Sequence, residues 1–289
     1  MIGEIYAILT ALLRGYAVVP VRKGLKYSTP STSAIIYLLI NTTILWAITL
    51  YNNSFKLPLA DGFIYFVLAG ITAPGIATRF RDISITRIGI ILTTPIVSTN
   101  TLLSMVIAVF FLGEKLTPNL AAGALLIFTG INLLTWRGEN TGEWRKKDLI
   151  YPIAAAFLYA ISTNLRKLGL LKIGDPIVGA AITSTVSLIM LVFTSQVSQA
   201  LGSNSWELRF NKEALKYFGF SGLISSIAFL TYFMALSSSS VVKIQPIAGT
   251  NPLFAVMFSY LFLKNQEQIT TRSLLGTLIV VAGIILITI

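Results

Sequence analysis

Long apolar segments follow one another along almost the whole chain, and this pattern constrains the fold more than any single motif does. A helix that crosses a bilayer needs about 20 mostly apolar residues. The chain is 55% hydrophobic and only 11% charged, and it divides into about ten segments of that length. Backbone groups inside a bilayer must be hydrogen-bonded within the protein, so we expect helices. The sequence therefore predicts an all-α integral membrane protein with ten transmembrane helices.

The spaces between these segments predict how the chain is divided. The first segment has no basic region before it and no small-residue cleavage site after it, so we expect an uncleaved helix. The most polar stretch, 136–148, lies at the middle of the sequence. We expect a basic linker at 138–148 between two units, 1–137 and 149–289. The expected spans are 3–21, 32–51, 62–81, 86–112, 118–136, 149–166, 176–198, 214–236, 241–263 and 271–289.

A proline-containing motif occurs once in each half. The residues 95–100 (PIVSTN) return in imperfect form as 246–251 (PIAGTN). Proline lacks an amide donor and crowds the carbonyl four residues earlier, so we expect kinks at Pro95 and Pro246 and a further kink at Pro252. Freed carbonyls are expected at Ile91 and Val242. Broken helices at matching places in two halves point to the binding site of a transporter.

The correspondence between the halves extends beyond this motif. Gly123 and Gly130 near one end match Gly276 and Gly283 near the other. Five spans per repeat is an odd number, so consecutive repeats enter the membrane from opposite sides. The sequence thus predicts two inverted five-helix repeats with a cavity between them. We expect the paired glycines to allow close helix packing.

The distribution of lysine and arginine predicts the orientation. Most of them lie in the connections that follow odd-numbered spans, which should therefore be cytoplasmic, with both termini outside. Arg166, Lys167 and Lys172, assigned to the connection after the sixth span, disagree with this orientation. We expect a multi-pass protein of the cell (plasma) membrane. The net charge of +11 then reflects orientation in the bilayer, and nucleic acid is not an expected partner.

Several short features follow one another in order, most of them in both halves. They are Arg22-Lys23 before Pro30, Arg166-Lys167 before Pro176, Pro95 and Pro246 in the fourth span of each half, Leu112-Gly113-Glu114-Lys115 at the end of the fourth span, and Gly123 in the fifth. This ordered set resembles the EamA family of the drug/metabolite transporter superfamily, over essentially the whole chain. The resemblance implies ten helices around a central cavity, spans five and ten at the periphery, and alternating access. It implies no particular substrate. The second half departs from the pattern at 263–267 (LKNQE).

Arg14 is the leading candidate for contact with a substrate. A cation at the centre of a bilayer costs about 2.5–3.5 kcal/mol on insertion scales. Arg14 could extend to the interface or bind freed carbonyls, or it could pair with a carboxylate or phosphate of a substrate. The repeat places Tyr159 at the corresponding position. Arg79 lies one turn inside the short connection after the third span and is a second cationic candidate.

Polar side chains on the kinked spans and their neighbours supply the other candidates. Thr94, Ser98 and Thr101 share one helix face by their spacing. Such stripes can also join helices, at about 0.6 kcal/mol per contact. The remaining substrate-binding candidates are Asn100, Thr163, Asn164, Ser225, Tyr232, Gln245 and Asn251.

The residues that are absent limit the chemistry. The chain contains no cysteine and no histidine, so we expect no disulfide, no metal site and no cofactor. No carboxylate falls near the middle of an expected span, which argues against a proton-coupled exporter of cationic drugs. Glu114 should form an interfacial pair with its neighbour Lys115.

The leading interpretation is a secondary transporter that moves a small polar metabolite, such as an amino acid or organic anion, by alternating access around a midplane cavity. The alternative is a broad-specificity exporter of hydrophobic or drug-like compounds, in which Arg14 is structural. An enzyme is not expected because the usual catalytic groups are missing. The repeats and prolines also disfavour a scaffold that transports nothing. The expected partners are a small-molecule solute and the lipid bilayer, with the protein a monomer or homodimer.

Overall fold

The structure, a computed structural model, describes residues 1–52, 62–135, 145–200, 208–262 and 271–289. Within these ranges the regular elements are all helical and no strand occurs. The first half contains α1 (Ile2–Gly24), α2 (Pro30–Tyr51), α3 (Phe63–Gly70), the π-helical η1 (Ile71–Ile76), α4 (Ala77–Ser98), α5 (Asn100–Leu112) and α6 (Pro118–Thr135). The second half contains the 3₁₀ turn η2 (Lys146–Leu149), α7 (Ile150–Ile173), α8 (Pro176–Ala200), α9 (Lys212–Ser238), α10 (Val241–Ala248), α11 (Asn251–Phe262) and α12 (Thr271–Thr288).

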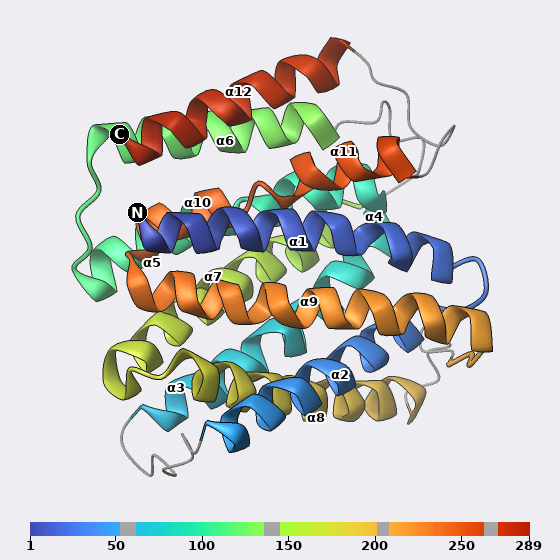
Figure 1. The fold of residues 1–289 in the computed structure, drawn as a ribbon. Coiled ribbons are helices and arrows are strands. Elements are labelled where there is room, and N and C mark those ends of the chain that lie inside the picture. Colours follow the sequence, from blue (N-terminus) through green and yellow to red (C-terminus); the bar gives the residue numbers. More distant parts are fainter. Residues whose placement is uncertain (53–61, 136–144, 201–207, 263–270) are drawn as a thin grey trace.

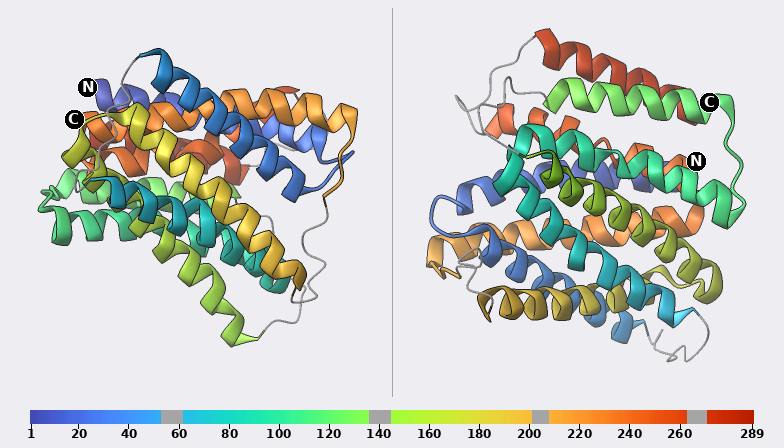
Figure 2. Two further views of the ribbon diagram at one scale, coloured as in Figure 1. Left: turned by 90° about the horizontal axis from the view of Figure 1, so that it is seen from below. Right: turned by 180° about the vertical axis from the view of Figure 1, so that it is seen from behind.

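The helices confirm an integral membrane protein. In the described ranges, 7 helical stretches are long and apolar enough to cross a bilayer, and two further apolar helices, Pro118–Leu133 and Leu275–Thr288, are shorter. Large apolar side chains face outward, such as Phe110 at 80% and Phe111 at 79% exposed, as expected of a surface covered by lipid. Both termini lie at the same end of the molecule (Figures 1 and 2). The expected count of ten spans remains a prediction.

Helices from the two halves pair across the molecule. In Figure 1, α6 and α12 lie side by side at one edge, α1 and α9 cross the middle, and α2 lies near α8 at the other edge. Gly123 faces the carbonyl oxygen of Gly283, and Gly130 faces that of Gly276, so α6 and α12 run antiparallel. The glycine prediction is thereby confirmed: each glycine allows the backbones to approach where a side chain would not fit.

The helix breaks follow the repeated prolines instead of preceding them. Pro95 and Pro246 lie inside α4 and α10, and the breaks fall four residues later, at Thr99 and Thr250. There the Thr99 hydroxyl donates to the Ile96 carbonyl (2.6 Å) and the Thr250 hydroxyl to the Ile247 carbonyl (2.7 Å). The same contact occurs at matching positions, and each carbonyl also accepts the backbone amide of the same threonine, at 3.2 Å for Thr99 and 3.1 Å for Thr250.

The connection between the third and fourth spans lies later than predicted. The sequence placed it at 82–85, but the chain turns at Gly89, whose φ of 78° and ψ of 163° are not helical. The Ser84 and Thr93 hydroxyl oxygens are 2.7 Å apart. In a straight helix, residues nine apart would be separated by about 13 Å. Glycine adopts this positive φ without steric cost, so the chain turns at Gly89 and not among the arginines that precede it.

A break in the third span was not predicted. Between α3 and α4, Ala73 has an extended backbone (φ −153°, ψ 134°) because it precedes Pro74. Its carbonyl therefore leaves the helical ladder and is bound by side chains of α7: the Ser162 hydroxyl at 3.1 Å and the Arg166 guanidinium Nη2 at 2.7 Å. The structure thus adds a third interrupted segment to the two expected from the repeat.

The sixth span was predicted too short. It was expected to end at residue 166, but α7 continues to Ile173. Arg166 and Lys167 therefore lie inside the helix, 7% and 8% exposed, where the sequence analysis had placed them in an external connection. The span was predicted to end here because both residues are charged. Both can be buried because backbone carbonyls of the protein accept their hydrogen bonds.

Close packing of α6 on α12 predicts a strong effect of one methyl group. A Cβ atom at Gly130 would lie 2.8 Å from Val280 Cγ2 and 2.9 Å from the Gly276 oxygen, whereas one at Gly219 would meet nothing within 4 Å. We expect Gly130→Ala to destabilise the protein by about 1–3 kcal/mol. A lower melting temperature of the detergent-solubilised variant, measured by intrinsic fluorescence, would reveal this loss. Gly219→Ala is the matched control and should melt no lower than the parent.

Candidate functional site

A cavity of about 620 Å³ lies among the broken helices. This volume falls in the ordinary range for sites that bind small molecules. It is bordered by α4, α5, α7, α9, α10 and α11, together with single residues of α1 and α2 and residues of η1 and α6. The sequence-predicted residues in its wall are Arg14, Thr94, Ser98, Asn100, Thr101, Tyr159, Thr163, Tyr232, Gln245, Asn251 and Pro252.

A chain of hydrogen bonds joins five helices along this wall. The Tyr232 hydroxyl donates to Gln245 Oε1 (2.6 Å), so its single proton is used and the Thr163 hydroxyl, 3.2 Å away, must donate to it. Gln245 Nε2 donates to Asn100 Oδ1 (3.1 Å), and Asn100 Nδ2 donates to the Val97 carbonyl (2.7 Å). The chain runs in one direction from α7 through α9 and α10 to the break between α4 and α5. It therefore joins both broken helices.

Three arginines line the cavity, and no described carboxylate does. The guanidinium carbon of Arg14 on α1 lies 4.8 Å from the ring centre of Tyr232, and that of Arg166 on α7 lies 5.8 Å from the same point. Arg81 on α4 is the third. The described part of the wall thus carries an excess of positive charge around an aromatic ring, a favourable arrangement for a cation–π contact.

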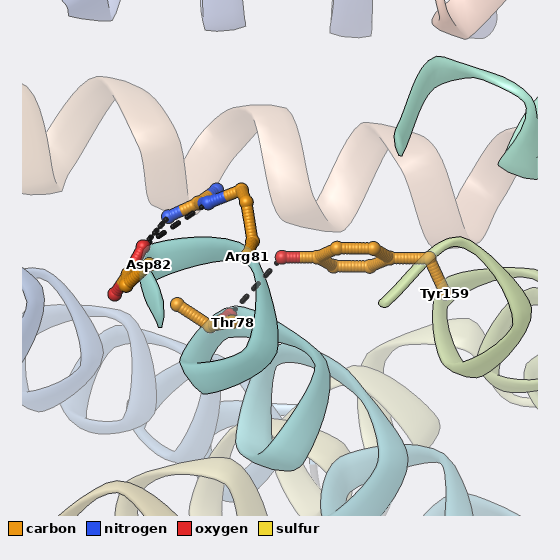
Figure 3. A network of polar contacts seen from close by, with 4 residues as sticks. All are labelled: Thr78, Arg81, Asp82 and Tyr159. Carbon is orange, nitrogen blue, oxygen red and sulfur yellow. Dashed lines mark hydrogen bonds and ion pairs between the residues drawn. The ribbon is translucent and has the colours of Figure 1, made fainter. Parts of the chain in front are cut away.

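Arg81 is compensated by its neighbour in the sequence. Its Nε and Nη2 donate to Asp82 Oδ1 at 3.2 and 3.1 Å. Figure 3 shows this guanidinium turned toward Asp82, while the Tyr159 ring reaches from α7 to the hydroxyl of Thr78 on α4, at 3.2 Å. Tyr159 therefore links α7 to α4 through Thr78, while Arg81 pairs within α4; both Arg81 and Tyr159 line the cavity.

Five residues named from the sequence do not border the cavity. Asn164 is buried, and its Nδ2 donates to the carbonyls of Ser104 (3.1 Å) and Ala160 (2.9 Å), so it joins α7 to α5. Ser225 and Arg79 are half-buried outside the wall. Pro95 and Pro246 lie within their helices, consistent with a role in helix shape alone. In this structure Asn164 makes hydrogen bonds between helices.

Other parts of the wall were not predicted from the sequence. Arg166 was assigned to a connection, and four further lining residues were not among the candidates: Arg81, Tyr37, Pro74 and Phe128. Pro74 inside an apolar segment, between Gly70 and Gly75, was the available signal for a break. Arg166 carried a signal too, since an arginine sixteen residues after the start of α7 at Ile150 can still lie within the bilayer.

The end of the molecule that holds the termini is closed by side chains acting on helix ends. Glu114, after α5, accepts hydrogen bonds from the amides of Val241 (2.8 Å) and Val242 (2.9 Å) at the start of α10. Buried Lys167 donates to the carbonyls of Leu236 (2.7 Å) and Ser239 (2.8 Å) at the end of α9. The expected surface pair of Glu114 with Lys115 is thus wrong: the carboxylate instead satisfies amide donors of the other half.

The cavity extends away from this closed end. Its wall runs from Arg166 and Gln245 toward Arg81 and Ile85, near the turn at Gly89. Among the described residues, none of the lining ones comes from the first turn of α10 or the last turn of α5. One end of the molecule is therefore sealed by contacts between the halves, and the cavity lies on the other side of that seal.

An all-helical fold of apolar spans around a cavity lined by polar and apolar side chains is typical of membrane transporters. The chain belongs to the EamA-like transporter family, whose model matches residues 1–136 and 147–289. The family and the relatives below place it in the drug/metabolite transporter superfamily, as the sequence resemblance predicted.

Two relatives agree with this assignment, and a solved structure shares the fold. An uncharacterized transporter of Archaeoglobus fulgidus is 28% identical over 205 residues, which cover 71% of this chain and 68% of that protein. A chloroplastic WAT1-related protein of Arabidopsis thaliana is 25% identical over 284 residues, covering 94% of this chain but 66% of its own length. A crystal structure with a TM-score of 0.81 and 14% identity matches 99% of this chain and 95% of its own, so the fold is shared.

The two hydrogen bonds from the start of α10 to Glu114 should contribute measurably to the free energy of unfolding. Glu114→Ala leaves two backbone amides at a helix start without their acceptor, at a cost of about 1–2 kcal/mol. Glu213→Ala is a matched control, since Glu213 is exposed and pairs only with exposed Lys216 (2.8 Å), a contact worth under about 1 kcal/mol. Thermal unfolding in detergent should show a clearly lower melting temperature for Glu114→Ala alone. Equal shifts for both variants would contradict the assigned role of Glu114.

Proposed function

We propose that this protein is a secondary transporter that moves a small polar metabolite across a membrane by alternating access. The observation that carries the proposal is the cavity between broken helices, walled by arginines, hydroxyls and amides. Irregular backbone at membrane depth is tolerated where it is buried in protein or lines a wet cavity. The residues proposed to contact the solute are those sequence candidates that border the cavity, together with Arg166.

The moving parts in this proposal are two inverted five-helix repeats, within ten spans. The antiparallel pairing of α6 with α12 supports it, because the fifth spans of two inverted repeats must run in opposite directions. Asn100 bonded to Gln245, and Glu114 bonded to the start of α10, give the same antiparallel order for the fourth spans. The family model also matches the chain in two segments.

We place the termini outside, so that the basic connections lie in the cytoplasm. The cavity then extends toward the cytoplasm, and the seal around Glu114 and Lys167 faces the exterior. Transport would require that seal to open while the region around Gly89 closes. We propose the cell membrane as the location and a monomer or homodimer as the transporting unit, with no catalytic step.

The alternative of an exporter for hydrophobic or drug-like compounds draws on the aromatic residues Phe128, Phe229 and Tyr232 in the wall. The arginines favour a polar solute instead, because a purely apolar ligand would leave their donors without partners. Flux of labelled solutes into proteoliposomes distinguishes the two. Uptake of small polar solutes with no competition from hydrophobic cations is the expected result.

The absence of cysteine from the chain allows a direct test of water access. We expect Thr94→Cys, in the cavity wall, to react with a membrane-impermeant thiol reagent and to be protected by a transported solute. Leu125→Cys is the control: Leu125 is 53% exposed on the outer face of α6, where lipid would keep the thiol protonated and unreactive. A Thr94→Cys variant that is folded but as unreactive as the control would refute a water-filled cavity.

A further inference from the structure

Two of the three cavity arginines have no charge partner among the described residues. Arg81 is compensated by Asp82, but Arg14 and Arg166 form no ion pair in the described ranges, and Arg14 makes no hydrogen bond there. Both guanidinium groups lie within 6 Å of the ring centre of Tyr232. Two uncompensated cations therefore face one small volume inside the protein. Such an arrangement is unfavourable unless a counterion completes it.

Arg166 is the more constrained of the two. The residue is 7% exposed and lies beside the rings of Phe229, Tyr232 and Phe233, at 5.4, 5.8 and 5.7 Å from their centres. Its Nη2 binds the Ala73 carbonyl (2.7 Å), which holds the side chain against the break in the third span. Its Nε is buried without a hydrogen-bond partner. A fixed, buried donor without an acceptor marks a place that a ligand atom can fill.

The neutral polar groups nearby are hydrogen-bonded to one another and add nothing to the excess of positive charge. Thr163, Tyr232, Gln245 and Asn100 donate in sequence, and their chain ends on the Val97 carbonyl. Each of these bonds uses a donor of one residue and an acceptor of the next. The guanidinium groups add charged donors to this wall and can accept nothing. The ligand that fits such a surplus is one that brings acceptor oxygens and negative charge.

We propose that Arg14 and Arg166 form an anion subsite that selects solutes bearing a carboxylate or phosphate group. This inference rests on the proposed transport function and names the substrate class. Guanidinium forks bind planar carboxylate and phosphate oxygens through paired, charge-assisted hydrogen bonds. Two positive charges favour an anion of charge −2, either a dicarboxylate or a phosphate monoester. The rings of Phe229 and Tyr232 then pack against its carbon skeleton.

Binding of named probes to the purified full-length protein tests the substrate class. The probes are succinate, glycerol 3-phosphate, zwitterionic serine and cationic choline, each added at equal ionic strength in a thermal-shift titration. A ligand that binds only the folded state raises the melting temperature. We expect succinate or glycerol 3-phosphate to raise it and serine and choline to leave it unchanged. A higher melting temperature with succinate indicates recognition of carboxylate, and one with glycerol 3-phosphate indicates recognition of phosphate.

Variants then locate the subsite. Arg14→Gln removes a side chain that makes no hydrogen bond in the described structure, so it should fold and bind the dianion at least tenfold more weakly. Arg166→Lys retains the charge while losing the planar fork, and should also weaken binding. Lys172→Gln is the matched control, because it removes one positive charge from an exposed position on the same helix. It should bind like the parent.

Flux measurements separate failure of this inference from failure of the proposed function. Proteoliposomes that take up serine while excluding both dianions would overturn the anion subsite and leave a polar-metabolite transporter. A folded Arg14→Gln variant with unchanged dianion affinity would overturn it as well. Flux of none of the four solutes, together with an unreactive Thr94→Cys, would instead overturn the transport function. Dianion uptake that is lost in Arg14→Gln but kept in Lys172→Gln is the supporting result.

Discussion

The satisfaction of backbone carbonyls at helix breaks within the bilayer is the constraint on which this structure depends. A lipid environment offers such carbonyls no partner, so each break needs donors from the protein itself. In the two repeated motifs, the hydroxyl and the amide of Thr99 and of Thr250 both donate to the carbonyl three residues earlier. At the third break, the donors are Ser162 and Arg166 of α7. Because α7 must lie against that break, buried charge and open backbone meet beside the same cavity.

The contacts between the halves differ in kind at the two ends of the molecule. Near the termini, Glu114 and Lys167 bind the ends of α10 and α9 and hold the halves together. Toward Gly89, Tyr159 contacts Thr78, and Arg87 of α4 pairs with Asp148 (2.8 Å) and lies over the Tyr151 ring of α7. Hydrogen bonds at helix ends can be exchanged for water once they are exposed, at a modest net cost. The seal is therefore of a kind that a transport cycle could open and remake.

The sequence predicted much of the fold from two sources. Apolar length located most of the helices, and the repeated motif at Pro95 and Pro246 located the breaks to within one turn. Gly123 and Gly130 identified the packing of α6 correctly. The prediction was wrong for the sixth span, which was ended at Arg166 because that residue is charged. The helix continues because carbonyl groups inside the protein accept hydrogen bonds from the buried charges. The turn at Gly89 was predicted several residues too early because the arginines indicated a connection. Its position depends instead on glycine, which adopts a positive φ without strain.

The account as a whole rests on opening of the seal around Glu114 when the cavity closes at its other end. Spin labels at Lys115 and Ser238, both exposed beside that seal, would report the separation of the two halves in liposomes by pulsed electron spin resonance. Adding a transported solute should shift the distance distribution toward a second, longer population. A single short distance under every condition, in a preparation that demonstrably transports the solute, would contradict the account.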